Sequence, residues 1–280
     1  MFRIEAVFRP ESEEGVRSLL EEYRGRVEVI AGGTDLLIKP KPEIRFLIDL
    51  SSLGLDYVSR DGQYIRIGAT SVIASLLNCE FFDDAPYRIL KTAARLFGTQ
   101  QTRNRATVGG NICSAVPSAD LPVALIALDA KVEISGDERK IMLLEDFITG
   151  YRKTALGESE FLREIQIPIA ADEPRSVFQK LCRTSVDLAL VNCAVKLNID
   201  STPRDARIVL GAVAPTPIRA RRAERMLNET QSIDDESISA VSEIASDETK
   251  PISDLRASAE YRRAMSRVLV ERAIRQTLQW

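Results

Sequence analysis

The spacing of apolar and polar positions predicts a mixed set of helices and strands in the first 170 residues. Ser12 is followed by two acidic residues and then by apolar positions at helical spacing, which predicts a helix that begins after a capping residue. Short β-branched or apolar runs predict strands, and Asp61-Gly62 predicts a hairpin turn between two of them. The strands are expected at 27–30, 46–49, 55–59, 64–67, 131–134 and 161–168, and further helices at 72–77, 84–97 and 121–128. The run 161–168 ends at Pro168, so we expect an edge or mixed strand there.

Beyond residues 171–174, a polar segment ending in proline, the order of elements changes. Three strand-like runs come first, at 176–181, 188–197 and 207–213, and three helical patterns follow, at 220–227, 238–245 and 261–278. The last is an amphipathic helix whose predicted apolar face carries Tyr261, Ala264, Met265, Val268, Leu269, Ala273 and Leu278. Strands followed by helices are typical of an α+β domain. The chain is therefore predicted to form one domain over 1–172 and a second over 175–280.

The stretch from Gln100 to Leu121 contains a Gly-Gly pair, small and hydroxyl residues, and one acid. This composition is poor for a helix or a buried strand, but glycine lets backbone approach a ligand closely. A second Gly-Gly, Gly32-Gly33, directly follows a β-branched run. Neither loop has the spacing of a Rossmann fingerprint or a P-loop. Two readings stay open: each loop is a simple turn, or main-chain amides of both loops face the pyrophosphate of one dinucleotide.

Composition and charge exclude several classes of function. The net charge is −3 with no basic stripe, so no nucleic-acid partner is expected. No apolar run reaches the roughly 18–20 residues of a membrane span, and the N-terminus turns acidic by Glu11 instead of forming a signal peptide, so a cytoplasmic protein is expected. The absence of histidine excludes Ser-His-Asp catalysis and histidine-ligated metals. The four cysteines, at 79, 113, 182 and 193, lack metal-binding spacing and are expected to be buried free thiols.

The segments A-G-G-T-D-L-L (31–37) and T-V-G-G-N-I-C-S (107–114) resemble the FAD-binding medium subunit of molybdenum hydroxylases. That family includes the carbon monoxide, nicotinate and xanthine dehydrogenases. Further segments of the same likeness occur in the same order along most of the chain: 68–70, 97–103, Asp120, 180–183, 187–189 and 211–217. The resemblance implies an α+β protein. It would have a two-lobed FAD-binding domain of the PCMH type, with lobes at about 1–57 and 58–172, and a small C-terminal α+β domain with a three-stranded sheet plus helices.

The resemblance also implies positions for FAD, which would be clasped between the two loops. Ala31, Gly32, Gly33, Thr34, Asp35 and Leu36 would form the first loop on the cofactor, and Thr107, Gly110, Asn111 and Ser114 the second. Asp120 would reach a ribose hydroxyl or a nearby group, Phe97 would lie against the flavin, and Lys180 would stand near the pyrimidine end, where a cation stabilises an anionic reduced flavin. No catalytic acid–base residue and no metal ligand is expected in this chain.

Simpler structural roles stay open for several of these residues. Phe97 is equally well explained as a core residue, Lys180 as a solvated strand residue, and Asp120 as a helix N-cap. Cys113 is better explained as a small space-filling residue than as a redox thiol. The basic run 219–222 is either a solvated helix face or a contact with a partner subunit.

By resemblance, this chain would be an electron-transfer subunit. It would take electrons from [2Fe–2S] clusters of a small partner subunit and pass them to a soluble external acceptor, while a molybdopterin-binding large subunit oxidises the substrate. The three chains would form a hetero-oligomer, with a dimer of heterotrimers as one arrangement. Two alternatives remain: a free-standing FAD-dependent oxidase or reductase with its own substrate pocket, and a scaffold subunit that has lost FAD. Intact glycine loops argue against the scaffold.

Overall fold

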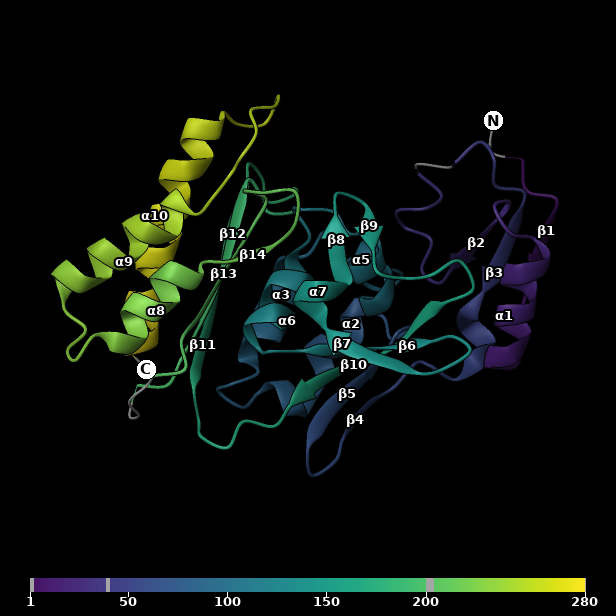
Figure 1. Cartoon of the computed structure of the whole chain (residues 1–280), viewed down its shortest axis with the longest axis horizontal. Helices are drawn as coiled ribbons and strands as arrows, with labels where there is room; N and C mark the ends of the chain where they lie inside the picture. The colour runs from purple at the N-terminus through teal and green to yellow at the C-terminus, as the bar shows by residue number, and fades with distance from the viewer. Residues whose placement is uncertain (1–2, 39–40, 200–203, 280) are drawn as a thin grey trace.

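The protein is built from layers that follow one another along its long axis (Figure 1). The computed structural model describes residues 3–38, 41–199 and 204–279. The N-terminal lobe stands at one end, and a five-stranded sheet and a layer of helices follow it. A second sheet and three C-terminal helices complete the order at the other end. Within the described residues, no helix combines the length and the apolar character needed to cross a membrane.

The N-terminal lobe is a small parallel sheet covered by one helix. Its strands are β1 (Ala6–Phe8), β2 (Val27–Ile30) and β3 (Phe46–Asp49), with β3 in the middle. Helix α1 (Glu13–Glu22) begins where the sequence predicts, because the side chain of Ser12 accepts a hydrogen bond from the Gly15 amide. A 3-10 turn, η1 (Leu50–Leu53), follows β3. The predicted strands 27–30 and 46–49 are confirmed.

The five-stranded sheet has the order β4-β5-β10-β6-β7. Strands β4 (Val58–Arg60) and β5 (Tyr64–Gly68) form the predicted hairpin, and β6 (Lys131–Ser135) is the predicted strand extended by one residue. The prediction of an edge or mixed strand at 161–168 is wrong. Strand β10 (Phe161–Pro168) is central and pairs antiparallel with β5 and β6. Its proline is tolerated because it is the last residue, where the missing amide falls at the end of the ladder.

Helices pack on one face of this sheet and include the glycine-rich stretch. They are α2 (Ile73–Asn78), α3 (Arg88–Leu96), α4 (Gln100–Arg103), α5 (Val108–Cys113) and α6 (Asp120–Ala127), with η2 (Glu80–Phe82) before α3. The expectation that residues 100–121 avoid helix is wrong, since α4 and α5 lie within them. Both are short, and each begins at a threonine whose side chain accepts an amide proton of the first turn. The remaining elements of this domain are β7 (Lys140–Leu143), α7 (Leu144–Phe147), β8 (Ile148–Gly150) and β9 (Lys153–Thr154).

The C-terminal part contains the three predicted strands and three predicted helices. The strands are β11 (Arg175–Leu181), β12 (Val191–Leu197) and β13 (Arg207–Gly211), and the sequence missed a two-residue fourth strand, β14 (Ile218–Arg219). The helices are α8 (Arg221–Glu229), α9 (Asp235–Asp247) and α10 (Ala259–Leu278). The predicted apolar face of α10 is partly wrong, because Tyr261 is exposed whereas Arg262 and Ser266 are buried.

Strand β12 is buried along its whole length because its two faces meet different layers. Its residues at odd positions, 191 to 197, pack in the core formed with the C-terminal helices. On the opposite face, Ala194 joins the core of the first domain, and the polar Asn192 and Lys196 meet carboxylates at the two ends of α6. The helix layer with α3 and α6 is therefore enclosed between two sheets (Figure 1).

Candidate cofactor-binding site

The two glycine loops touch each other, although more than 70 residues separate them. A Cβ placed on Gly32 would lie 2.0 Å from the carbonyl oxygen of Arg105 and 3.0 Å from the Cα of Ala106. Only glycine permits this contact between the first loop and the residues that lead into Thr107. Gly33 has a φ of +72°, a left-handed conformation that also favours glycine. The Gly-Gly pair is therefore required both by the turn and by the close approach.

The first loop presents main-chain donors without protein acceptors. The turn is closed by the Leu37 amide, which donates to Gly33 O at 3.1 Å, and by the Ile38 amide, which donates to Asp35 O at 3.2 Å. In the part of the chain that the structure describes, the amides of residues 32–36 donate to no protein group. Successive amides left open in a turn provide a site suited to an anion such as a diphosphate.

The second loop differs from our expectation, because the amides of residues 108–111 all have protein acceptors. Those of Val108 and Gly109 donate to Ser71 O and Ala69 O, at 2.9 and 3.0 Å. Those of Gly110 and Asn111 both donate to Thr107, to its side chain and its carbonyl respectively. These four amides therefore do not serve as free donors for a ligand.

In place of free amides, the second loop offers a buried side-chain acceptor. Asn111 Oδ1 is buried, and it has no hydrogen-bond partner within the described residues. The hydroxyl of Ser114 donates to the Asn111 carbonyl at 2.9 Å. A buried acceptor without a donor is destabilising, so the site lacks a donor that a bound ligand would provide.

Arg152 joins the two loops, and sequence reasoning missed it. Its guanidinium donates to both carboxylate oxygens of Asp35, at 3.1 and 3.3 Å, and its amide donates to Ala115 O at 2.9 Å. Both Arg152 and Ala115 have positive φ values, 53° and 44°. Arg152 lies in the turn between β8 and β9, outside every sequence motif, so only the folded chain reveals it. The Asp35 carboxylate is thus already paired within the protein.

Asp120 and Lys180 form a buried ion pair between α6 and β11. Lys180 Nζ lies 2.7 Å from Asp120 Oδ2 and donates to Leu96 O at 2.9 Å, and the two side chains are only 1% and 5% exposed. Asn192 Nδ2 donates to the second oxygen of Asp120 at 2.8 Å. Burial raises the pKa of Asp120, although Lys180 and Asn192 act to lower it. Phe97 directly follows Leu96, so these polar groups and the aromatic ring lie at one junction between α3, α6 and β11.

The structure distinguishes between the alternative structural roles that the sequence leaves open for several of these residues. Lys180 is not a solvated strand residue, and Asp120 is the first residue of α6 and caps nothing with its side chain. Phe97 is half-buried and packs against the main core. All four cysteines are free, and burial raises the pKa of the Cys113 thiol to about 12, which fits a space-filling role.

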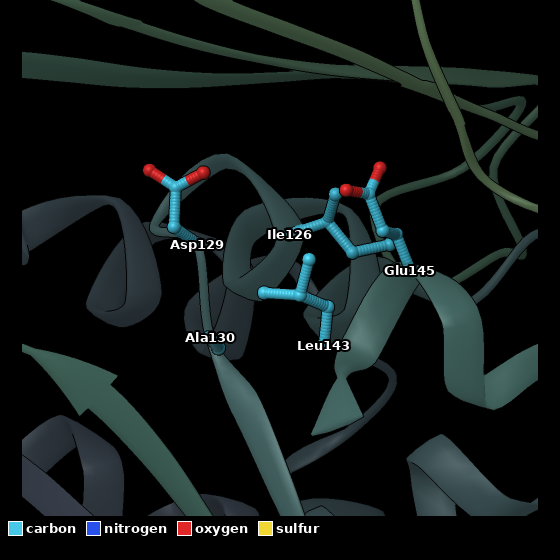
Figure 2. A pocket seen from close by; sticks show the side chains of 5 residues that line it. All are labelled: Ile126, Asp129, Ala130, Leu143 and Glu145. Atoms are coloured by element: carbon cyan, nitrogen blue, oxygen red, sulfur yellow. The ribbon is translucent and has the colours of Figure 1, made fainter. Parts of the chain in front are cut away.

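The basic run 219–222 makes contacts inside the chain. Arg219 is only 10% exposed and pairs with Glu224 at 2.7 Å, and Arg221 pairs with Glu145 at 2.8 Å. A small cavity of about 10 Å³ lies beside this contact, lined by Ile126, Asp129, Ala130, Leu143 and Glu145. Figure 2 shows the carboxylates of Asp129 and Glu145 at its rim, pointing the same way. A space of this size holds at most one water molecule, so it belongs to the junction between the domains and not to a ligand site.

The described residues contain no cluster of histidine, cysteine, aspartate or glutamate side chains that could hold a metal ion. These residues offer a set of open amides in the first loop, an unpaired amide oxygen in the second, and a buried lysine that donates to the carbonyl before Phe97. Diphosphate oxygens need donors, and a reduced flavin benefits from a positive neighbour. The donor set therefore fits FAD.

Comparison with known proteins agrees with this fit. Residues 1–170 match the family described as the FAD binding domain in molybdopterin dehydrogenase, and residues 176–277 match the CO dehydrogenase flavoprotein C-terminal domain. The chain is 32% identical to the carbon monoxide dehydrogenase medium chain of Hydrogenophaga pseudoflava over 273 residues, which cover 95% of this chain and 94% of that protein. It is 28% identical to the xanthine dehydrogenase FAD-binding subunit of Escherichia coli O157:H7, covering 89% and 88% of the two chains.

Solved structures show the same relationship. A carbon monoxide dehydrogenase structure from Hydrogenophaga pseudoflava superposes with a TM-score of 0.93 at 31% identity, covering 99% of this chain and 98% of that one. Quinoline 2-oxidoreductase from Pseudomonas putida 86 gives a TM-score of 0.91 at 26% identity, covering 100% and 98%. Fold and site thus define an FAD-binding oxidoreductase subunit. More narrowly, the chain belongs to the family of FAD-binding medium subunits of molybdenum hydroxylases.

Proposed function

We propose that this chain transfers electrons through FAD, receiving them from [2Fe–2S] clusters on a small partner subunit and passing them to a soluble external acceptor. The observation that supports the proposal is the contact between Gly32 and the Arg105 carbonyl, which brings the first loop, with its open amides, against the residues that lead into the second loop. Bound FAD would supply the redox chemistry, because none of the protein side chains in this site is a redox group.

The first loop would hold the diphosphate. The amides of Gly32, Gly33, Thr34, Asp35 and Leu36 would donate to its oxygens, with Ala31 at the entrance to the turn. Asn111 would accept from a hydroxyl or amide donor of the cofactor, while Thr107, Gly110 and Ser114 keep that side chain in place through the bonds of the second loop. Arg152 fixes the first loop through Asp35.

Lys180, Phe97 and Asp120 would lie at the flavin end. Two of the three Nζ protons of Lys180 are engaged by Asp120 and Leu96, which leaves one for the ring system. Asp120 holds the ammonium group in place, so it would position Lys180 as well as, or in place of, contacting a ribose hydroxyl. Phe97 would pack against the ring.

The partners we propose are a molybdopterin-binding large subunit, which oxidises the substrate, and the two-cluster small subunit. The described part of this chain has no metal-binding cluster of its own, so the proposal assigns those centres to other chains. We place the complex in the cytoplasm, where the four free thiols of this chain remain reduced.

The test is the reduction of the bound flavin. The purified chain should be yellow and should release FAD on denaturation, and its flavin should be bleached by a reduced two-cluster subunit but not by small organic donors. Bleaching by an organic donor with this chain alone would favour a free-standing FAD-dependent oxidase or reductase. A colourless chain that takes up no FAD would contradict both proposals.

A further inference from the structure

The N-terminal lobe is joined to the rest of the molecule by one connection, which passes through Gly54. Gly54 ends the 3-10 turn η1 with a φ of +66°, and apart from its chain neighbours no described atom lies within 4 Å of a Cβ placed on it. Leu55 follows directly, and its carbonyl accepts from the Thr70 amide at 3.1 Å. The Tyr57 amide donates to Ser71 Oγ at 3.0 Å. The chain is therefore attached to the second lobe from Leu55 onward, and Gly54 is the last residue before that attachment.

The lobe shares little apolar packing with the rest of the protein, at one end of which it stands (Figure 1). None of its described residues up to Gly54 belongs to the main hydrophobic core. The lobe has a small core of its own, which consists of Val16, Leu20, Ile48 and Leu50 together with Leu55 and Phe161 from beyond Gly54. A unit with few buried apolar contacts to its surroundings opens at a low cost in free energy.

Hydrogen bonds to Glu13 hold the lobe against the five-stranded sheet. The carboxylate of Glu13, in the first turn of α1, accepts from Ser135 Oγ at 2.6 Å, from Arg163 Nε at 2.9 Å and from Arg139 Nη2 at 3.1 Å. These partners lie on β6, on β10 and in the connection before β7, so one side chain binds three segments of the second lobe. The Glu13 side chain is 28% exposed, so this contact is open to solvent.

Three ion pairs cross the same border between the lobes. They are Arg17 with Asp137 at 3.0 Å, Arg24 with Glu158 at 2.6 Å and Asp35 with Arg152 at 3.1 Å. Their carboxylate side chains are 90%, 69% and 42% exposed, respectively. Dissolved salt screens pairs of this exposure, and each contributes little to stability by itself. The lobe is therefore held largely by contacts that are ionic and individually weak.

The two glycine loops belong to different lobes. The first loop directly follows β2 of the N-terminal lobe, and its Gly32 meets the Arg105 carbonyl of the second lobe. The amides of the second loop are bonded to Ser71 and Ala69, so that loop stays with the second lobe. A rotation of the N-terminal lobe at Gly54 therefore separates the two loops.

We propose that the N-terminal lobe is a clamp on the cofactor, which opens by rotating at Gly54 and is held closed by Glu13 and the three ion pairs. This inference rests on the function proposed above and concerns how the same site exchanges FAD. Hinges of this kind are a few loop residues that absorb a change of φ and ψ. Opening would withdraw the amides of the first loop from the diphosphate, so the rate of FAD release would follow the ease of opening. Salt would increase that rate, because it screens the ion pairs.

The first experiment compares Gly54→Ala with Gly25→Ala. Both glycines have left-handed φ values, +66° and +74°, and open space around a Cβ, so alanine adds the same backbone strain without a clash. Gly25 lies between α1 and β2, inside the lobe, so only at Gly54 does rotation of the lobe relieve the strain. The full-length flavin-loaded protein, with the subunits that co-purify with it, is diluted, and free flavin is separated at intervals. We expect Gly54→Ala to release FAD about tenfold faster than Gly25→Ala.

The second experiment compares Glu13→Gln with Glu14→Gln in the same assay at low and at high salt. The partners of Glu13 lie outside both glycine loops, so its replacement leaves the cofactor contacts themselves unchanged. We expect Glu13→Gln to release FAD about fivefold faster than wild type at low salt, and to show a weaker increase with salt. Glu14 is an exposed neighbour, and Glu14→Gln should keep the wild-type rate and the wild-type salt dependence.

Hydrogen exchange separates rotation of a folded lobe from its unfolding. The amides of β2 and β3 should exchange far more slowly than FAD leaves, because both strands stay paired while the lobe turns. Exchange of these strands at the rate of FAD release, equal release from the two glycine variants, or equal release from the two glutamate variants would each overturn the clamp. In those cases the protein still binds FAD and accepts electrons, so the proposed function stands. A protein that carries no flavin would instead contradict the function itself, and the clamp with it.

Discussion

The ammonium nitrogen of Lys180 lies 2.7 Å from Oδ2 of Asp120, and this ion pair joins the two domains inside the molecule. Lys180 belongs to β11 and Asp120 to α6, so the C-terminal sheet is attached to the first turn of that helix. A second polar contact lies just beyond the other end of α6, where Lys196 Nζ is 2.6 Å from Asp129 Oδ2. Asn192 and Lys196, four residues and about 13 Å apart on β12, reach Asp120 at the start of α6 and Asp129 just beyond its end, so the strand contacts a carboxylate at each end of the helix.

Replacing Lys180 by methionine should lower the free energy of unfolding by about 3–5 kcal/mol, because it leaves the Asp120 carboxylate buried without a cation. The measurement is the midpoint of urea unfolding. Lys153→Met, which changes an exposed lysine, is the control and should alter the midpoint little. Adding Asp120→Leu to Lys180→Met should recover most of the loss. A double variant as unstable as the single one would contradict the ion-pair explanation.

The same pair predicts a pH dependence. Burial raises the pKa of Asp120 from its ordinary value of 3.8, and removal of Lys180 removes a group that lowers it, so the pKa in Lys180→Met should rise further. A carboxyl group whose pKa is higher in the folded state contributes stability that is present below 3.8 and is lost as the pH rises through the folded-state pKa. The deficit of Lys180→Met relative to wild type should therefore be smaller in acid than at neutral pH. A deficit that grows on acidification would contradict it.

Replacing Gly32 by alanine should weaken FAD binding. The new Cβ would lie 2.0 Å from the Arg105 carbonyl oxygen, so the two glycine loops must move apart, at a cost of about 1–3 kcal/mol. The ratio of flavin absorbance to protein absorbance after purification measures the effect and should fall several-fold. Gly62→Ala is the control, because no atom lies within 4 Å of a Cβ at that position. Equal flavin content in the two variants would show that the loops are not held in contact around the cofactor.

Much of the architecture could be predicted from apolar spacing, because most elements expose one face and bury the other. Thus α1, β2, β3 and the β4–β5 hairpin lie where the sequence places them. Two features depend on contacts between residues far apart in the sequence and could not be predicted from apolar spacing. Strand β10 is central because it has partners on both sides, and Arg262 is buried because two carbonyls and Asp254 receive its protons.

The contact between the two glycine loops agrees with the sequence prediction, while the position of the cofactor between them stays a prediction. The Gly-Gly pairs mark backbone that approaches other groups closely, and the two loops do meet. Which amides remain open depends on Ser71, Ala69 and Thr107, acceptors that no local pattern assigns to the second loop. Arg152 was missed for the same reason, because its role follows from where the β8–β9 turn lies in the fold.

Replacing Asn111 by leucine should affect the protein in two opposite ways. Without cofactor, the change removes a buried acceptor that has no partner among the described residues, so the free energy of unfolding should stay equal or rise by about 1 kcal/mol. With FAD, the same change removes a hydrogen bond, and the dissociation constant should rise by about tenfold. Flavin fluorescence titration and thermal unfolding of the apoprotein measure the two effects. A large loss of apoprotein stability would assign Asn111 a structural role instead.

Replacing Glu13 by glutamine should loosen the attachment of the N-terminal lobe. Glu13 accepts hydrogen bonds from Ser135, Arg163 and Arg139, all outside its own lobe. Burial acts to raise the pKa of Glu13, but these bonds outweigh it and lower the pKa below 4.5. A carboxyl group whose pKa is lowered in the folded state contributes stability that is present above pH 4.5 and is lost as the pH falls through the folded-state pKa.

Urea unfolding should therefore show Glu13→Gln to be less stable than wild type by about 1–2 kcal/mol at neutral pH, with the difference vanishing in acid. Glu14→Gln, an exposed neighbour in the same helical turn, is the control. A pH-independent difference would mean that the charge of Glu13 has no part in holding the lobe.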